Sequence, residues 1–323
     1  MSGGRSAATP VSVTSGSAAE GTRAKRVPAR PAPPGLIGPA GAGERGARAA
    51  VAHTLVLAGR NLVQYARVPA ILINTVIFPA CLLLVFDTVY GRTVEEVTGS
   101  PSGTRLVALT TMVAAMFGGT SSGLALLQDR EAGLLARLHT MPVHRAAPIA
   151  GRLLAEAARV VVAAVVLALV GHLIGFRFSA GPLAAVAYFA VVAGVSAGLA
   201  APVLVLALRA RGPAGVGMLA PLYILMMFFN TGFVPADHYP DAISGLVRVL
   251  PVSAVVDSLL GLSEGGALRS PLLLTLAWFG GLAAVFGTVA VRSYRRAVSG
   301  DGGPSRSRSG KNGPEKSGPE KQI

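Results

Sequence analysis

Few residues of this sequence have the types and the spacing that chemistry requires. Residues 41–46, Gly-Ala-Gly-Glu-Arg-Gly, match the G-x-G-x-x-G pattern of dinucleotide-binding turns, but no expected strand precedes them, so we interpret the match as chance. His53 has no second ligand at metal-binding spacing. The sequence contains no H-E-x-x-H motif and no G-x-x-x-x-G-K-[ST] nucleotide-binding loop. It therefore predicts no catalytic residue, no metal site and no cofactor held by this chain.

Composition indicates a membrane protein. Of the 323 residues, 52% are hydrophobic and 14% are charged, whereas soluble domains carry about 25% charged residues. The apolar residues form long runs, and the single cysteine, Cys81, lies in one of them, so no disulfide framework forms within the chain. The net charge of +14 is concentrated in the two ends and in short loops. Because the inner loops of membrane proteins have this character, we expect no nucleic-acid partner.

The apolar runs predict an all-α membrane protein with six transmembrane helices. A helical span takes about 20 apolar residues, and we place the spans at residues 68–90, 106–127, 153–176, 182–208, 216–234 and 271–291. With the N-terminus inside, the inner segments hold 24 of the 29 Lys and Arg residues and the outer segments hold 5. The positive-inside rule therefore predicts that both termini are cytoplasmic.

The chain is expected to have three parts. Residues 1–47 and 299–323 are rich in Gly, Pro, Ser and basic residues, so we expect two disordered cytoplasmic tails, the second able to contact membrane lipids. Residues 48–298 form the transmembrane domain. This domain begins with residues 51–69, whose apolar and arginine-bearing sides at helical spacing predict an amphipathic helix in the inner membrane interface.

The middles of the expected spans carry no charged residue. Glu156 and Arg159 are placed at the inner end of the third span, and the polar Asn74 and Asn230 are expected to bond neighbouring helices. Transporters driven by protons or sodium usually carry carboxylates near mid-depth. A transporter that moves its substrate against a concentration gradient without such carboxylates takes its energy from a partner protein. That partner must bind a cytoplasmic part of the chain.

Only one internal cytoplasmic loop is long enough for a partner protein to bind, and it lies between the second and third spans. Charged residues and leucines alternate at helical spacing over residues 129–139, and Pro142 ends this helix. Two interpretations stay open, an interfacial helix with its leucines in lipid and a helix that docks on a partner ATPase. In the second interpretation, the residues that would couple to the ATPase are Asp129, Arg130, Glu131, Leu134, Leu135, Arg137 and Leu138.

Residues 235–262 are apolar but interrupted by proline and glycine, which predicts a re-entrant helical hairpin in the outer leaflet between the fifth and sixth spans. Asp257 in its second half is expected to cap a helix or to accept a hydrogen bond. Methionine and aromatic side chains suit varied apolar contacts, although they suit ordinary helix packing equally well. As candidate lining of a substrate pathway we name Met112, Met116, Phe117, Met226, Met227, Phe229 and Asn230.

Three stretches resemble the ABC type-2 permease family. They are LLQDREAGLLARLHTMPVHRAAPIAGRLLAE from residue 126, FFNTGFVPADHYPDAISGLVRVLPVSAVVDSLLGL at residues 228–262, and GRNLVQYARVPAILINTVIFP from residue 59. Their order and spacing are similar to the family over about residues 50–292, and most similar to the daunorubicin-resistance-type permeases of actinobacteria. The resemblance implies a permease that pairs with a second copy or a paralogous permease. It also implies a separate ATPase subunit, which binds the ATP, with residues 129–139 as the coupling helix.

The predicted function is therefore the permease subunit of an ATP-driven exporter in the cell membrane, with no enzyme activity of its own. Its expected substrates are amphipathic drug-like or lipid-like compounds, because the interior is apolar and uncharged. Two other classes stay open. A membrane enzyme acting on lipids requires a polar cluster near one interface, and an ion-coupled secondary transporter requires a carboxylate at mid-depth.

Overall fold

The computed structural model of the chain describes residues 47–68, 73–134, 146–210 and 212–298. All of them lie in the larger of the two units into which the chain divides, residues 40–323. The described residues form helices joined by short connections, with no strand among them. The two predicted tails lie outside these ranges, except for residue 47.

The first half of the described chain contains the longest helices. They are α1 (Ala47–Arg67), the π-helical turn η2 (Ile73–Ile77), α3 (Phe78–Thr98), α4 (Ser102–Glu131), α6 (Ala147–Leu173) and α7 (Pro182–Arg209). The second half contains shorter pieces. They are α8 (Pro213–Gly217), α9 (Ala220–Phe228), η3 (Ala236–His238), α10 (Asp241–Val249), α11 (Pro251–Leu260), η4 (Gly261–Gly265), α12 (Arg269–Thr275), η5 (Leu276–Gly280) and α13 (Gly281–Val298).

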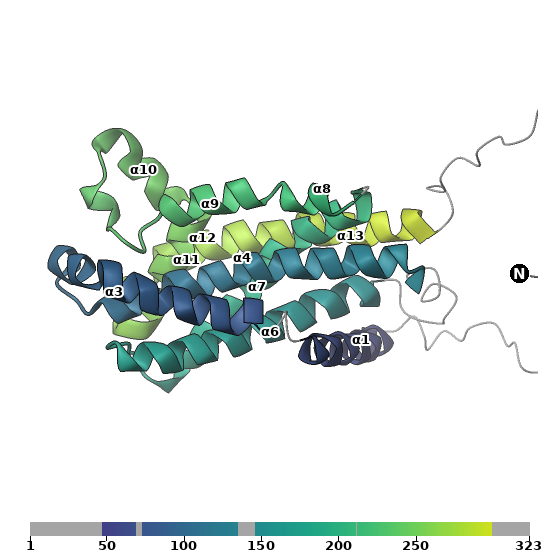
Figure 1. Cartoon of the computed structure of the whole chain (residues 1–323), viewed down its shortest axis with the longest axis horizontal. Coiled ribbons are helices and arrows are strands. Elements are labelled where there is room, and N and C mark those ends of the chain that lie inside the picture. Colours follow the sequence, from purple (N-terminus) through teal and green to yellow (C-terminus); the bar gives the residue numbers. More distant parts are fainter. Residues whose placement is uncertain (1–46, 69–72, 135–145, 211, 299–323) are drawn as a thin grey trace, which may run out of the picture. The chain divides into compact units, whose positions relative to one another are not determined.

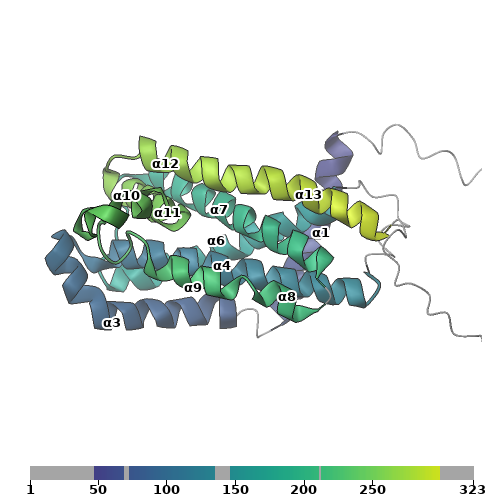
Figure 2. The same cartoon turned by 90° about the horizontal axis from the view of Figure 1, so that it is seen from above.

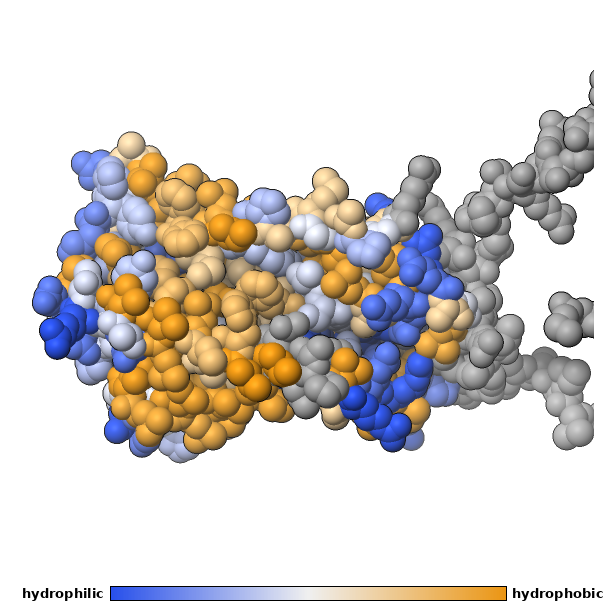
Figure 3. Space-filling view, in the orientation of Figure 1, coloured by the Kyte–Doolittle hydropathy of each residue, from blue (hydrophilic) through white to orange (hydrophobic). Residues whose placement is uncertain are grey.

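Five of the six predicted spans are present as long apolar helices. They run over Thr75–Thr98, Ser102–Glu131, Ala147–Leu173, Pro182–Arg209 and Arg269–Tyr294. The side of the molecule in Figure 3 has a broad apolar band between two more hydrophilic ends, as expected where lipid tails surround the middle of a bundle.

The predicted fifth span, residues 216–234, is not a single long helix. Its residues fall into α8, with 5 residues, and α9, with 9 residues, followed by turns. Pro221 lies in the first turn of α9, because proline lacks the backbone N–H that a helix interior uses. The glycines on either side of Val216 weaken the preceding helix. The next apolar segment is a bent pair instead: α10 and the helix from Pro251 to Gly265 meet at 72°.

The core is built around α4. Within its most apolar stretch 83% of the residues are buried, against 11% for the span at Arg269–Tyr294. Figure 2 shows α4 and α7 in the middle of the bundle, with α3 at one edge and α12 and α13 at the other. Gly123 permits the close approach of α4 to α7, since a Cβ there would lie 2.5 Å from Val203 Cγ1.

The helix α1 lies across the end of the bundle where α4 and α13 end (Figures 1 and 2). Of its predicted apolar side, Ala58 and Tyr65 are buried against α6, whereas Leu55 is exposed. The two helices approach closely at Gly151 of α6, where a Cβ would lie 3.0 Å from the Thr54 carbonyl oxygen. The amphipathic helix therefore packs against the bundle instead of resting on a membrane surface alone.

Candidate functional site

One apolar cavity of about 170 Å³ lies between α4 and α9. The α4 side contributes residues at helical spacings of three and four, and so does the α9 side, so each helix turns one stripe toward the cavity. The lining residues are Val113, Met116, Phe117, Thr120, Ala220, Tyr223, Ile224 and Met227. A cavity with this lining suits an apolar or aromatic ligand, because methionine and aromatic side chains adapt to varied apolar shapes.

Three predicted pathway residues meet at this cavity. Met116 and Phe117 from α4 and Met227 from α9 are all in its lining. Met112 is buried in the core, and Met226 packs against that core. The structure therefore brings together Met116, Phe117 and Met227 at the cavity. Met112 and Met226 pack in or against the hydrophobic core instead.

The last two predicted pathway residues lie at the end of α9. Phe229 is exposed, and Asn230 is fully buried. The Asn230 amide donates to the Met227 carbonyl oxygen, and its side-chain oxygen accepts the Gly232 N–H at 2.7 Å. Asn230 thus caps the helix that forms one wall of the cavity, and does not bond a neighbouring helix as the sequence suggested.

Sequence reasoning missed the other five lining residues. Tyr223 and Ile224 are two of them, and on α4 the polar Thr120 is another. The helical spacing of residues 220, 223, 224 and 227 could be seen in the sequence. The sequence did not show that these residues face a stripe on α4, because the two stripes are about 100 residues apart. Which stripes face each other is decided by tertiary packing.

A buried ion pair occupies the middle of α6. Glu156 is fully buried and Arg159 is 6% exposed, and Arg159 Nη2 lies 2.6 Å from Glu156 Oε2. α6 begins at Ala147, ahead of the predicted span at residues 153–176, and Glu156 and Arg159 are the tenth and thirteenth of its 27 residues. Their place at the inner end of the span stays a prediction.

The guanidinium of Arg159 also binds two other helical elements. Its Nη2 donates to the Gly118 carbonyl oxygen of α4 at 2.6 Å, and its Nη1 donates to Thr75 Oγ1 of η2 at 2.5 Å. Tyr65 of α1 supplies its aromatic ring, whose centroid lies 5.1 Å from the guanidinium carbon. One side chain of α6 therefore contacts α1, η2 and α4. In the described residues no group of three or more His, Cys, Asp or Glu side chains is arranged to hold a metal ion.

Comparison with known proteins identifies the family of this chain. The profile of the ABC-2 type transporter family matches residues 52–262. The chain belongs to the ABC-2 type transporter family. ABC-2 permeases are multi-pass membrane proteins that act as transport subunits and work with an ABC ATPase partner.

Two relatives are named for drug resistance. The chain is 33% identical over 254 residues to the probable doxorubicin resistance ABC transporter permease protein DrrC of Mycobacterium tuberculosis, covering 79% of this chain and 92% of the relative. It is 31% identical over 258 residues to the daunorubicin resistance ABC transporter permease protein DrrB1 of Streptomyces coeruleorubidus, covering 79% and 90%. The match therefore spans nearly the whole of both permeases.

In this ABC-2 permease the residues predicted to couple to the ATPase begin at the end of α4. Asp129 forms an ion pair with Arg152 of α6, and Arg130 Nη1 donates to the Ala210 carbonyl oxygen at 2.9 Å. Glu131 is exposed. These contacts tie the end of α4 to both α6 and the end of α7.

The expected coupling helix over residues 129–139 does not start as a separate helix. Residues 129–131 are the last turn of α4, and Gly133 follows with φ 70°, a left-handed backbone that ends the helix. Leu134 comes next and lines a small cavity beside Asp129 and Arg152. The remaining predicted coupling residues, Leu135, Arg137 and Leu138, lie outside the described residues.

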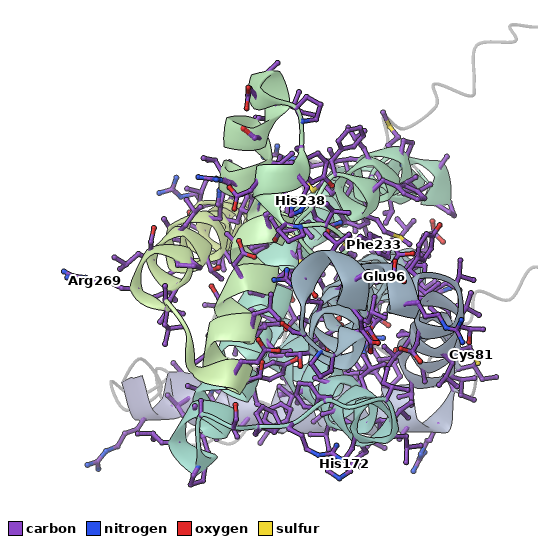
Figure 4. All side chains as sticks on the ribbon, turned by 90° about the vertical axis from the view of Figure 1, so that its left-hand side faces the viewer. Cys81, Glu96, His172, Phe233, His238 and Arg269 are labelled. Carbon is purple, nitrogen blue, oxygen red and sulfur yellow. The ribbon has the colours of Figure 1, made fainter. Side chains whose placement is uncertain are left out.

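At the opposite end of the bundle, Asp257 of α11 has the role predicted for it. Its Oδ1 accepts a hydrogen bond from Thr231 Oγ1 at 2.7 Å, and Arg105 Nη1 of α4 donates to the Thr231 carbonyl oxygen at 3.1 Å. Figure 4 views this end of the molecule, where His238 and Glu96 lie near α10 and α3. Asp257 therefore helps to join α11, α4 and the turn after α9.

Proposed function

We propose that this chain is the transmembrane subunit of an ATP-driven exporter that moves amphipathic drug-like or lipid-like compounds out of the cell. The observation that carries the proposal is the match to two drug-resistance permeases over 92% and 90% of their lengths. The apolar cavity between α4 and α9 supports it, since an anthracycline has a flat aromatic body that methionine and phenylalanine side chains can contact.

The proposed assembly places the chain in the cell membrane with both termini in the cytoplasm. ATP binds to the separate ATPase subunit, and a second copy of this chain or a paralogous permease completes the transmembrane part. The bent pair formed by α10 and residues 251–265 is the proposed re-entrant hairpin of the outer leaflet, supported by its 72° bend and by the proline that starts its second arm.

Transport in proteoliposomes tests this proposal. The chain is reconstituted with its ABC ATPase, and daunorubicin movement is followed by fluorescence. We expect drug movement that needs ATP and stops when the P-loop lysine of the ATPase is replaced, while an ionophore that collapses ion gradients leaves it unchanged. Drug accumulation by the chain alone under an ion gradient would refute the proposal.

A second candidate, an ion-coupled transporter, is favoured by one observation. Glu156 is a fully buried carboxylate within α6, one of the helices long and apolar enough to span a membrane, and such transporters use carboxylates as their coupling groups. Its pairing with Arg159 argues against this role, because the cation already compensates the charge. The ionophore arm of the same experiment separates the two functions.

The proposed docking site is the end of α4 and the segment that follows it. Exposed Glu131 is its most accessible charge, so Glu131→Arg should reduce co-purification of the ATPase by about tenfold, which corresponds to ~1.4 kcal/mol. Glu96→Arg is the matched control, because Glu96 is also an exposed helical glutamate but lies at the other end of the bundle (Figure 4). Equal ATPase recovery with both variants would contradict docking at this end.

A further inference from the structure

A chain of polar contacts runs along the seam between α4 and α6, from the end of α4 to the first span. Arg152 pairs with Asp129, and its Nη1 donates to the Ser122 carbonyl oxygen at 3.3 Å. The Ser122 hydroxyl lies 3.2 Å from the hydroxyl of Tyr65, whose ring faces Arg159. We call the set the polar seam, and its members are Asp129, Arg152, Ser122, Tyr65, Glu156, Arg159 and Thr75.

The seam begins and ends at elements that have different roles. Asp129 belongs to the turn of α4 where we place the ATPase, and Thr75 lies in η2, which leads directly into α3. η2 is a π-helical turn, a wider form of helix that holds an extra residue per turn and is frequent at functional sites. Arg159 is the junction, because its side chain contacts α1, η2 and α4 from α6.

Stability does not explain a buried ion pair in a bundle of this kind. Removing two charges from water is costly, and an apolar pair of similar size is often as stable or more stable. A paired charge with several hydrogen bonds does impose one fixed geometry on the groups around it. Arg159 bonds through Nη1 and Nη2, and its buried Nε has no hydrogen-bond partner among the described residues. The pair is therefore better suited to fixing how four elements sit against one another than to strengthening the core.

We propose that the polar seam transmits a displacement of the inner ends of α1 and α4 to the start of the first span, with Arg159 as the positioning residue. This inference rests on the proposed function, because the ATPase supplies the displacement. When the end of α4 moves, the bond between Arg159 and Thr75 makes η2 and α3 follow. Without that bond, ATP hydrolysis continues but moves less substrate.

Gly118 offers a way to disturb the junction without removing a charge. A Cβ at Gly118 would lie 2.9 Å from Arg159 Nη2 and still closer to Glu156 Oε1, so the ion pair must shift in Gly118→Ala. Its neighbour Gly119 is a matched control, since a Cβ there has no protein atom nearer than 3.5 Å. Both substitutions add one methyl group to the same helix.

The first test measures daunorubicin transported per ATP hydrolysed by the complete permease–ATPase complex in proteoliposomes. We expect Gly118→Ala to lower this ratio by about tenfold with ATPase recovery unchanged, which is within the range by which coupling networks act. Gly119→Ala should stay within about twofold of the wild type. An unchanged ratio for Gly118→Ala, or equal losses for both variants, would overturn the proposal.

The second test measures how rigidly the junction at Arg159 holds α1 against the first span, and it does not depend on transport. Cys81 is the single cysteine, exposed on α3 at the periphery of the bundle (Figure 4), and accepts a spin label. A second label at Val56→Cys, exposed on α1, reports the distance between α1 and the first span in full-length chain diluted with unlabelled chain.

We expect one narrow distance distribution for the wild type and for Gly119→Ala, and a broad one for Gly118→Ala. Identical distributions for all three would overturn the role of Arg159. If the wild-type complex fails to move drug although Gly118→Ala broadens the distribution, the export function is wrong and the junction stands.

Discussion

The apolar cavity and the polar seam lie on two faces of the same helix, α4. Phe117 points to the cavity, whereas the backbone of its neighbour Gly118 accepts a hydrogen bond from Arg159. The charges of the seam are paired with other protein groups, whereas the lining of the cavity has no charged side chain. One helix thus separates the surface proposed to meet substrate from the contacts proposed to move it.

The largest effect should come from breaking the ion pair on one side only. Arg159→Ala leaves Glu156 buried without its cation, so we expect a loss of about 3–5 kcal/mol of stability. The double variant Glu156→Gln/Arg159→Met should regain much of it, since no charge is left unpaired. Thermal unfolding in detergent measures these two variants together with Glu156→Gln and Arg159→Met alone. If the stability losses of these two single changes add up to the loss of the double variant, the pairing is contradicted.

Filling the cavity should have a smaller effect, confined to substrate binding. Ile224→Trp places a large ring at the cavity wall, so we expect about tenfold weaker daunorubicin binding, equivalent to ~1.4 kcal/mol. Leu222→Trp is the control, because Leu222 is exposed on the same helix but does not line the cavity. Fluorescence titration with daunorubicin measures both, and equal affinities would exclude the cavity from the binding site.

The smallest effect should follow from Tyr65→Phe, which keeps the ring near Arg159 and removes the hydroxyl contact with Ser122. We expect a loss of about 0.5–1.5 kcal/mol of stability at neutral pH.

Burial, helped by the charge of Glu156, raises the pKa of Tyr65. Because the unfolded tyrosine then ionises first, the wild type should lose stability as pH rises above about 10, and Tyr65→Phe should lose less. Parallel alkaline unfolding curves would contradict this.

Much of the fold followed from hydropathy, and the exceptions share a cause. The spans at α4 and α7 begin and end within a few residues of their predicted positions, since long apolar runs have one stable conformation in lipid. The predicted span at residues 216–234 and the coupling helix at residues 129–139 are both interrupted by glycine or proline. A hydropathy average over a long window hides a single glycine or proline, whereas one such residue is enough to end or interrupt a helix.

The candidate site was predicted only in part. The side-chain chemistry of Met116, Phe117 and Met227 indicated an apolar pathway, and the structure brings these three residues to one cavity. Asn230 looked equally suitable but caps α9, because a buried amide needs partners and the nearest carbonyl groups belong to its own helix. Residue type alone does not distinguish these roles.

The sequence by itself determined the class of the protein: apolar runs require helices that satisfy their own backbone groups in lipid, and the order of three stretches identified the family. Only the tertiary structure decided what Arg159 binds. Its contacts come from residues 65, 75, 118 and 156, on four different elements. A buried charge takes whatever partners the packed helices bring to it, and that packing is set by the whole bundle.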